Sequence, residues 1–139
     1  MSNQIIEEIK EFQKKWDEEK AILSAKFKDG FPTFFKEIFT KYPKLKAFRF
    51  TAYTPYFNDG DECIFRVGGA EEFLIEGYEK FDDYYSLGKE NEEWLKEVRT
   101  EVNKIIHSVK NHFYQDAFGD HIEITVYSDK TNIEEYDHE

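Results

Sequence analysis

The residues of this chain best suited to binding or catalysis lie in the segment TAYTPYFNDGDECI, residues 51–64. Asp59 and Asp61 place carboxylates on either side of Gly60, and clustered oxygen ligands are what Mg²⁺ or Ca²⁺ requires. The spacing does not follow the twelve-residue calcium loop, and an Asn-Asp-Gly run is also the preferred chemistry of a hairpin turn. We therefore interpret the run first as a turn between two strands and keep Asp59 and Asp61 as candidate metal ligands.

Arginine is rare in this chain, and two of its three arginines, Arg49 and Arg66, flank the same segment. Three aromatic side chains accompany them: Tyr53, Tyr56 and Phe57. Planar guanidinium donors beside stacking rings suit a small anionic ligand, such as a nucleotide. The alternative is that the arginines pair with carboxylates of the acidic segment 71–93, as is common on protein surfaces.

A second group of candidate residues lies nearer the C-terminus. If the preceding helix has ended by then, a turn gathers His112, Asp116, Asp120 and His121, which could hold a metal or transfer protons. Asp120 and His121 are the metal candidates of this group. Cys63 has no activating base near it in the sequence, and the chain contains no phosphate loop, dinucleotide fingerprint or zincin motif. Nothing in these patterns argues for an enzyme, and no cofactor is implied.

The charge distribution narrows the class of partner. The formal net charge is −11, and segment 58–93 carries twelve acidic against three basic side chains, whereas 31–50 carries five basic against one acidic. An acidic protein is repelled by a phosphate backbone, which argues against non-specific nucleic-acid binding. The acidic surface suits a basic protein partner instead, and the protein could act as a mimic of nucleic acid that inhibits such a partner.

Length and composition predict one domain spanning residues 1–139 in a reducing, cytoplasmic environment. A chain of 139 residues can bury one sizeable core, and aromatic residues at 18% must supply much of its volume. The single cysteine excludes a disulfide framework. Neither a secretion signal nor an apolar run long enough to span a membrane is present in the sequence.

Hydrophobic periodicity predicts an α+β fold with a largely antiparallel sheet of about four strands and two long helices and one short helix packed on it. The predicted elements are a helix at 4–28, a short helix at 32–42, strands at 45–52 and 63–67, a third strand at 71–77, a loop at 76–93, a helix at 91–115, a strand at 121–129 and a last strand containing Ile133.

The N-terminal helix has an apolar stripe with two alternative uses. The stripe comprises Ile5, Ile9, Phe12, Trp16, Leu23 and Phe27, with Glu19 interrupting it. It could pack inside the domain or form the seam of a coiled-coil dimer. We expect it to pack on the helix at 91–115, which has a similar length, and oligomerisation through it is the alternative.

Three stretches resemble a family of small phage and bacterial proteins without an established activity. They are YTPYFNDGDECIF at 53–65, FGDHIEITVYSD at 118–129 and EEYDH at 134–138. In that family a proline often follows the NDGD run, where this chain has Glu62. The resemblance implies a phage-encoded accessory role and marks these positions: Tyr53, Pro55, Tyr56, Asn58, Asp59, Gly60, Asp61, Asp120, His121, Asp137 and His138.

Taken together, the sequence favours a non-catalytic binding protein. The leading hypothesis is an anionic, nucleotide-like ligand held by Arg49, Tyr53, Tyr56, Phe57 and Arg66. The second is an acidic protein-interaction module that binds a basic partner, and the third is a metal-dependent enzyme that uses the Asp and His clusters.

Overall fold

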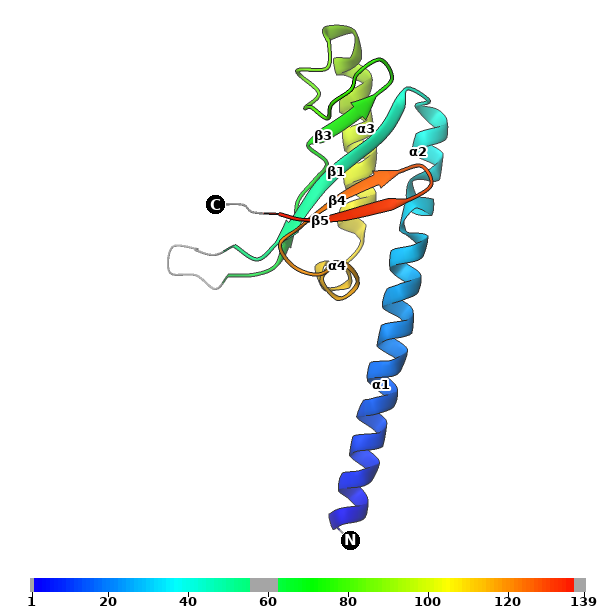
Figure 1. The fold of residues 1–139 in the computed structure, drawn as a ribbon, viewed down its shortest axis with the longest axis vertical. Coiled ribbons are helices and arrows are strands. Elements are labelled where there is room, and N and C mark those ends of the chain that lie inside the picture. Colours follow the sequence, from blue (N-terminus) through cyan, green and yellow to red (C-terminus); the bar gives the residue numbers. More distant parts are fainter. Residues whose placement is uncertain (1, 56–62, 137–139) are drawn as a thin grey trace.

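The protein has an α+β fold, as predicted, built on an antiparallel sheet of five strands (Figure 1). The computed structural model describes residues 2–55 and 63–136. The elements follow in the order α1 (Ser2–Gly30), the 3₁₀ helix η1 (Phe31–Phe35), α2 (Lys36–Lys41), β1 (Leu45–Tyr53), β2 (Arg66–Val67), β3 (Glu72–Ile75), α3 (Lys89–Ser108), α4 (Asn111–Phe118), β4 (Ile122–Tyr127) and β5 (Thr131–Glu135). The third strand and the last strand, both predicted from short alternating runs, are thereby confirmed.

Strand β1 is the centre of the sheet. It pairs with β4 along one edge, from Ala47 opposite Tyr127 to Ala52 opposite Ile122, and β5 completes that side. Its other edge is shared, because β3 pairs with the first half of β1 and β2 with its last two residues. The chain steps from β2 to β3 along this edge, where the Gly68 amide donates to the Thr51 carbonyl oxygen at 2.8 Å.

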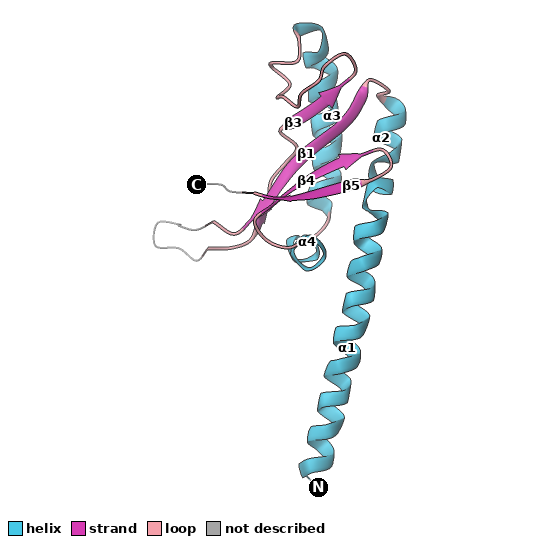
Figure 2. Ribbon diagram, in the orientation of Figure 1, coloured by secondary structure: helices cyan, strands magenta, loops and turns pink. Residues whose placement is uncertain are grey.

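One face of the sheet packs on the helices, and α3 lies behind it in the view of Figure 2. From β1 the core receives Phe48, Phe50 and Ala52, because alternate residues of a strand point to the same face. Tyr114 of α4 is fully buried, and its ring lies 6.0 Å from that of Phe50. Aromatic side chains therefore fill much of the core, as the composition indicates.

The helix predicted at 91–115 is two helices. α3 ends at Ser108, Val109 adopts an extended conformation (φ −95°, ψ 133°), and α4 begins at Asn111. Side chains satisfy two carbonyl groups of the last turn of α3, since Ser108 Oγ donates to Ile105 at 2.7 Å and Tyr114 Oη to Ile106 at 2.6 Å. The break lets α4 turn back toward the sheet.

Two details of the predicted hairpin also differ. The returning strand expected at 63–67 is limited to Arg66–Val67, and Cys63 is half-buried in irregular chain before it. The expected alternation of β1 places Lys46 on the face of Phe48, but Lys46 is exposed. Lys46 lies where the pairing with β3 has a register irregularity between Leu45 and Ala47.

The N-terminal helix meets the helix predicted at 91–115 only at its end, where it contacts α4, instead of packing along its whole length. α1 projects from the rest of the protein in Figure 1, and its main contacts are with α4 and with η1, which continues it toward α2. Only its C-terminal end joins the core, through Phe27, whose ring lies 5.5 Å from Phe31 and 5.8 Å from Tyr114. Among the residues described, no helix is long and apolar enough to cross a membrane.

Candidate functional site

The described parts of the three stretches that carry the family resemblance meet at one end of the sheet. β1 ends there at Tyr53, β4 begins just after His121, and β5 ends just before Tyr136. The rings of Tyr53 and Tyr136 lie 5.5 Å apart, and the Tyr136 amide donates to the His121 carbonyl oxygen at 2.8 Å. We call this group, together with Thr54, Arg66 and Asp120, the sheet-end cluster.

Asp120 ties the cluster together. Its Oδ1 accepts the backbone amides of Thr54 at 2.7 Å and His121 at 2.8 Å, and its Oδ2 accepts the Thr54 hydroxyl at 2.6 Å. Burial alone would raise the pKa of this carboxyl group, but the hydrogen bonds from Thr54 and His121 outweigh it and lower the pKa below its ordinary value. Asp120 therefore serves as an anionic acceptor that joins residues 66 positions apart.

This geometry does not favour a metal at Asp120. Oδ1 already accepts two N–H donors and Oδ2 accepts the Thr54 hydroxyl, so few acceptor sites of this carboxylate remain for a cation. Within residues 2–55 and 63–136, no group of three His, Cys, Asp or Glu side chains could hold a metal ion. The candidates Asp59 and Asp61 lie outside the described residues.

Arg66 is held at the cluster by contacts of its two neighbours. The carbonyl oxygen of Val67 lies 3.2 Å from His107 Nε2, and that of Phe65 accepts Asn111 Nδ2 at 3.4 Å. Phe65 and Val67 are buried, so the Arg66 side chain between them is exposed, directly opposite Tyr53 in the strand pairing. The fold thus presents a cation beside an aromatic ring at this end of the sheet.

Arg49 is engaged within the protein instead. Its Nε lies 2.8 Å from Glu72 Oε1, its Nη1 lies 3.7 Å from Glu123 Oε1, and its guanidinium stacks 4.3 Å from the Phe81 ring centroid. The hydrogen bond with Glu72 is the main reason that the Arg49 pKa is raised. This geometry favours the ion-pair interpretation for Arg49 over a ligand role.

Arg49 and Arg66 do not lie side by side on the sheet. Arg66 pairs with Tyr53, which is four residues, or roughly 13 Å, along β1 from Arg49. Tyr56 and Phe57 lie outside the described residues. The predicted ligand site is therefore reduced, in the described part of the chain, to Tyr53 and Arg66.

Two glutamates of the acidic segment 71–93 form ion pairs with arginines. Glu72 pairs with Arg49, and Glu71 pairs with Arg99 at 3.1 Å. The ion-pair interpretation predicts the Arg49–Glu72 contact, whereas it does not include Arg99. A basic partner for the acidic surface stays a prediction.

The largest uncovered apolar surface of the described chain is a stripe on α1 that we expected to be buried. Each of its side chains is between 48% and 65% exposed. The α1 stripe consists of five residues of the expected stripe, Ile5, Ile9, Phe12, Trp16 and Leu23, together with Ile6 and Ile22, which flank them on either side of the helix surface. Sequence periodicity identifies the stripe, but periodicity does not show whether another helix or strand of the chain covers it.

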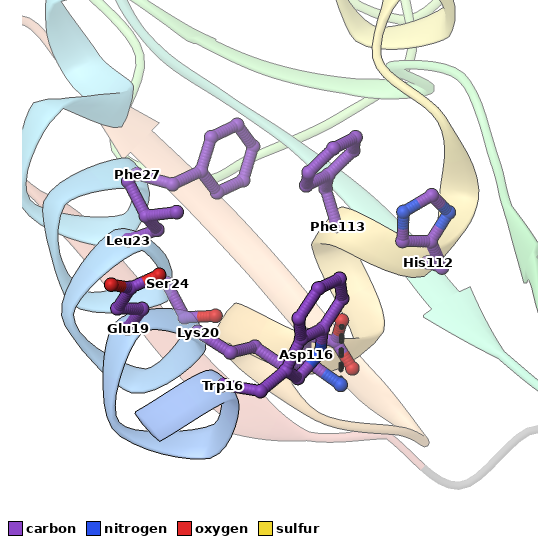
Figure 3. A pocket seen from close by; sticks show the side chains of 9 residues that line it. All are labelled: Trp16, Glu19, Lys20, Leu23, Ser24, Phe27, His112, Phe113 and Asp116. Atoms are coloured by element: carbon purple, nitrogen blue, oxygen red, sulfur yellow. Dashed lines mark ion pairs between the residues drawn. The ribbon is translucent and has the colours of Figure 1, made fainter. Parts of the chain in front are cut away.

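A groove of about 570 Å³ continues the α1 stripe where α4 packs against α1 (Figure 3). Trp16, Leu23 and Phe27 line it from α1, and Phe113 lines it from α4. At its margin Lys20 Nζ lies 3.4 Å from Asp116 Oδ2. Asp116 and His112 are thus helical residues of α4 beside this groove, and the expectation that the helix has ended before Asp116 is wrong.

No family model, curated protein or solved structure matches this chain. The resemblance to the phage and bacterial family stays a prediction. Functional hypotheses for this chain therefore depend on the geometry of the sheet-end cluster and of the α1 stripe.

Proposed function

We propose that this protein is a non-catalytic interaction protein that self-associates through α1. The observation that carries the proposal is the α1 stripe, whose seven large apolar side chains each remain about half exposed or more. Exposed apolar patches of this extent mark interaction surfaces in soluble proteins. A second copy of the chain is the partner that supplies a matching surface of the same length.

The area of the stripe is sufficient for a dimer. From the exposed fractions and ordinary side-chain areas, the seven residues leave on the order of 800 Å² uncovered on each chain. That is about the area that one partner contributes to a standard protein interface, roughly 800 Å². The stripe also extends along a helix of 29 residues, which is about 43 Å long.

Sedimentation equilibrium of the full chain over about 1 to 100 µM tests self-association. Wild-type protein should be dimeric at the upper end. Replacing the two stripe aromatics, Phe12→Ser with Trp16→Ser, should weaken the dimer at least 100-fold, because two aromatic anchors are lost from each chain.

A matched control variant lies on the opposite side of the same helix. Lys14→Ser with Glu18→Ser introduces the same two serines, leaves the net charge unchanged and alters exposed positions outside the stripe. This variant should dimerise like wild type. A wild-type protein that stays monomeric throughout this range, or equal weakening by both double variants, would contradict the proposal.

The sheet-end cluster supports a second candidate function, which is binding of a small anionic ligand, in keeping with an accessory role for the protein. The specific observation is that Arg66 is exposed beside Tyr53 while its neighbours are held by His107 and Asn111. A guanidinium beside an aromatic ring is suited to a phosphate-bearing planar ligand.

Calorimetric titration with a panel of nucleoside phosphates tests this second function. Arg66→Ala and Tyr56→Ala should each abolish or strongly weaken any binding found. Arg99→Ala is the matched control, because Arg99 is also a rare arginine but pairs with Glu71 away from the cluster. Affinity that is unaffected by Arg66→Ala and Tyr56→Ala, or absent in wild type, removes this candidate.

A further inference from the structure

We propose that the two copies associate with their α1 helices antiparallel, so that the N-terminal half of each helix fills the groove between α1 and α4 of the other. The inference rests on the proposed self-association and adds its orientation and the part played by α4. Three independent features support it, namely the residues of the seam, the charge of the two helix halves and the position of the groove.

The seam residues disfavour a parallel pair. When Ile9, Trp16 and Leu23 occupy the a positions of a heptad pattern, the d positions are Ile5, Phe12, Glu19 and Lys26. In a symmetric parallel pair each residue faces its own copy, so Glu19 would face Glu19 and Lys26 would face Lys26 inside the seam. Like charges placed in this way repel each other in a partly desolvated site.

An antiparallel pair removes both like-charge contacts. It sets a positions against d positions, and in one such register Ile5 faces Leu23 while Phe12 faces Trp16. Glu19 then faces Ile9 instead of another carboxylate, and its charged end can reach solvent at the edge of the seam.

The charges along α1 favour the same orientation. Residues 3–19 carry six acidic and three basic side chains, whereas residues 20–30 carry three basic and one acidic. An antiparallel arrangement sets each acidic half against the basic half of the other chain. A parallel arrangement sets like against like along the whole helix.

The groove lies where the antiparallel partner would need it. In Figure 3, Leu23 and Phe27 of α1 and Phe113 of α4 border an apolar space that the chain's own side chains leave open. Phe113 is 48% exposed there. The register that brings Ile5 opposite Leu23 also brings the N-terminal half of the partner helix along this space, and two-fold symmetry fills both grooves at once.

Distances between spin labels on full-length protein decide the orientation. In a Cys63→Ser background, Asn3→Cys and Lys14→Cys each introduce one labelling site on the exposed side of α1, away from the stripe. In the antiparallel pair the two labels at position 3 should be at least about 30 Å apart, because 22 helical rises separate their levels. In a parallel pair they lie at the same level, so their distance equals that between labels at position 14. Labels at position 14 lie at similar levels in both arrangements and should show coupling in either one.

The outcomes separate the two proposals. Equal distances at positions 3 and 14 overturn the antiparallel inference and leave self-association standing. The absence of intermolecular coupling at both positions, with the protein at the highest concentration used for sedimentation, overturns self-association as well. A distance at position 3 that exceeds the distance at position 14 by at least about 10 Å supports the inference.

A substitution on α4 tests the groove itself. Phe113→Ser should weaken the dimer at least tenfold, whereas Tyr85→Ser, which alters another exposed aromatic far from α1, should leave the dissociation constant unchanged. Circular dichroism checks that both variants remain folded. Equal dissociation constants for the two variants would show that α4 takes no part in the interface.

Discussion

Replacing Asp120 with alanine removes the acceptor that three donors share at the sheet-end cluster. The amides of Thr54 and His121 and the hydroxyl of Thr54 would each lose their partner. Because β1 ends at Tyr53 and β4 begins at Ile122, the loss falls where the two central strands are joined by side-chain contact. We expect a measurable loss of global stability together with local loosening of both backbone segments.

The magnitude follows from the number and environment of the bonds. A hydrogen bond to a charged group contributes about 1.5–3 kcal/mol when it is well shielded. The Asp120 side chain is 30% exposed, so water can replace part of each bond, and we expect a total loss of about 2–3 kcal/mol. For a chain of this length that lowers the melting temperature by roughly 8 °C.

Asp120→Asn should lose less, about 1 kcal/mol, because its remaining oxygen can still accept the two backbone amides. Urea unfolding at neutral pH, followed by circular dichroism and tryptophan fluorescence, measures these free energies. Amide hydrogen exchange at Thr54 and His121 supplies the local measurement, and both sites should exchange faster in Asp120→Ala. The control is Glu71→Ala, which removes an exposed carboxylate paired with Arg99 and should change stability by less than about 0.5 kcal/mol.

The pH dependence gives an independent check on the same bonds. The folded-state pKa of Asp120 is lowered from its ordinary value of 3.8, so its contribution to stability is complete above the unfolded-state pKa and is lost as pH falls through the folded-state pKa. The stability difference between wild type and Asp120→Asn should therefore be constant above about pH 5 and shrink below about pH 4. Our account of Asp120 fails if Asp120→Ala is as stable as Glu71→Ala and the two amides exchange at wild-type rates.

Two further substitutions test the packing and the turns. Tyr114→Phe should lower the free energy of unfolding by about 1 kcal/mol, because the Ile106 carbonyl loses its buried donor. Tyr114→Ala should lower it by about 4 kcal/mol, because a cavity opens in the core. Equal stability of the two variants in urea unfolding would contradict this. Gly88→Ala should lower the free energy of unfolding by about 1–2 kcal/mol, because Gly88 has a φ of 94° and a Cβ there would lie 2.8 Å from the Tyr78 hydroxyl. Gly30→Ala is the control, because Gly30 has a φ of −87° and nothing lies within 4 Å of a Cβ there. Thermal melts of the two variants should show a loss of stability for Gly88→Ala alone.

Short-range patterns determined most of the secondary structure. The two-residue alternation predicts β1, β3, β4 and β5, and the helical period predicts α1 and most of α3, since each of these signals is written in neighbouring residues. The break at Val109 escaped this reasoning. A helical stripe continues across it, and only the packing of Tyr114 against the core decides that α4 must turn.

The sequence also indicates which residues are suited to bind a ligand, but not which of them are already engaged by ion pairs within the protein. Rare arginines beside aromatic residues are visible in the chain, and their pattern does not distinguish Arg49, which Glu72 and Glu123 engage, from Arg66, which β2 exposes. That distinction depends on strand pairing, which brings Glu72 opposite Arg49 across the sheet.

Only the tertiary structure decided two features on which the functional proposals depend. The first is the meeting of Thr54 with Asp120, because the register between β1 and β4 sets which distant residues become neighbours. The second is the exposure of the α1 stripe, because amphipathicity specifies an apolar face but not the surface that will cover it. Among the described residues, the rest of the chain covers only the last turns of α1 and leaves the remaining stripe exposed.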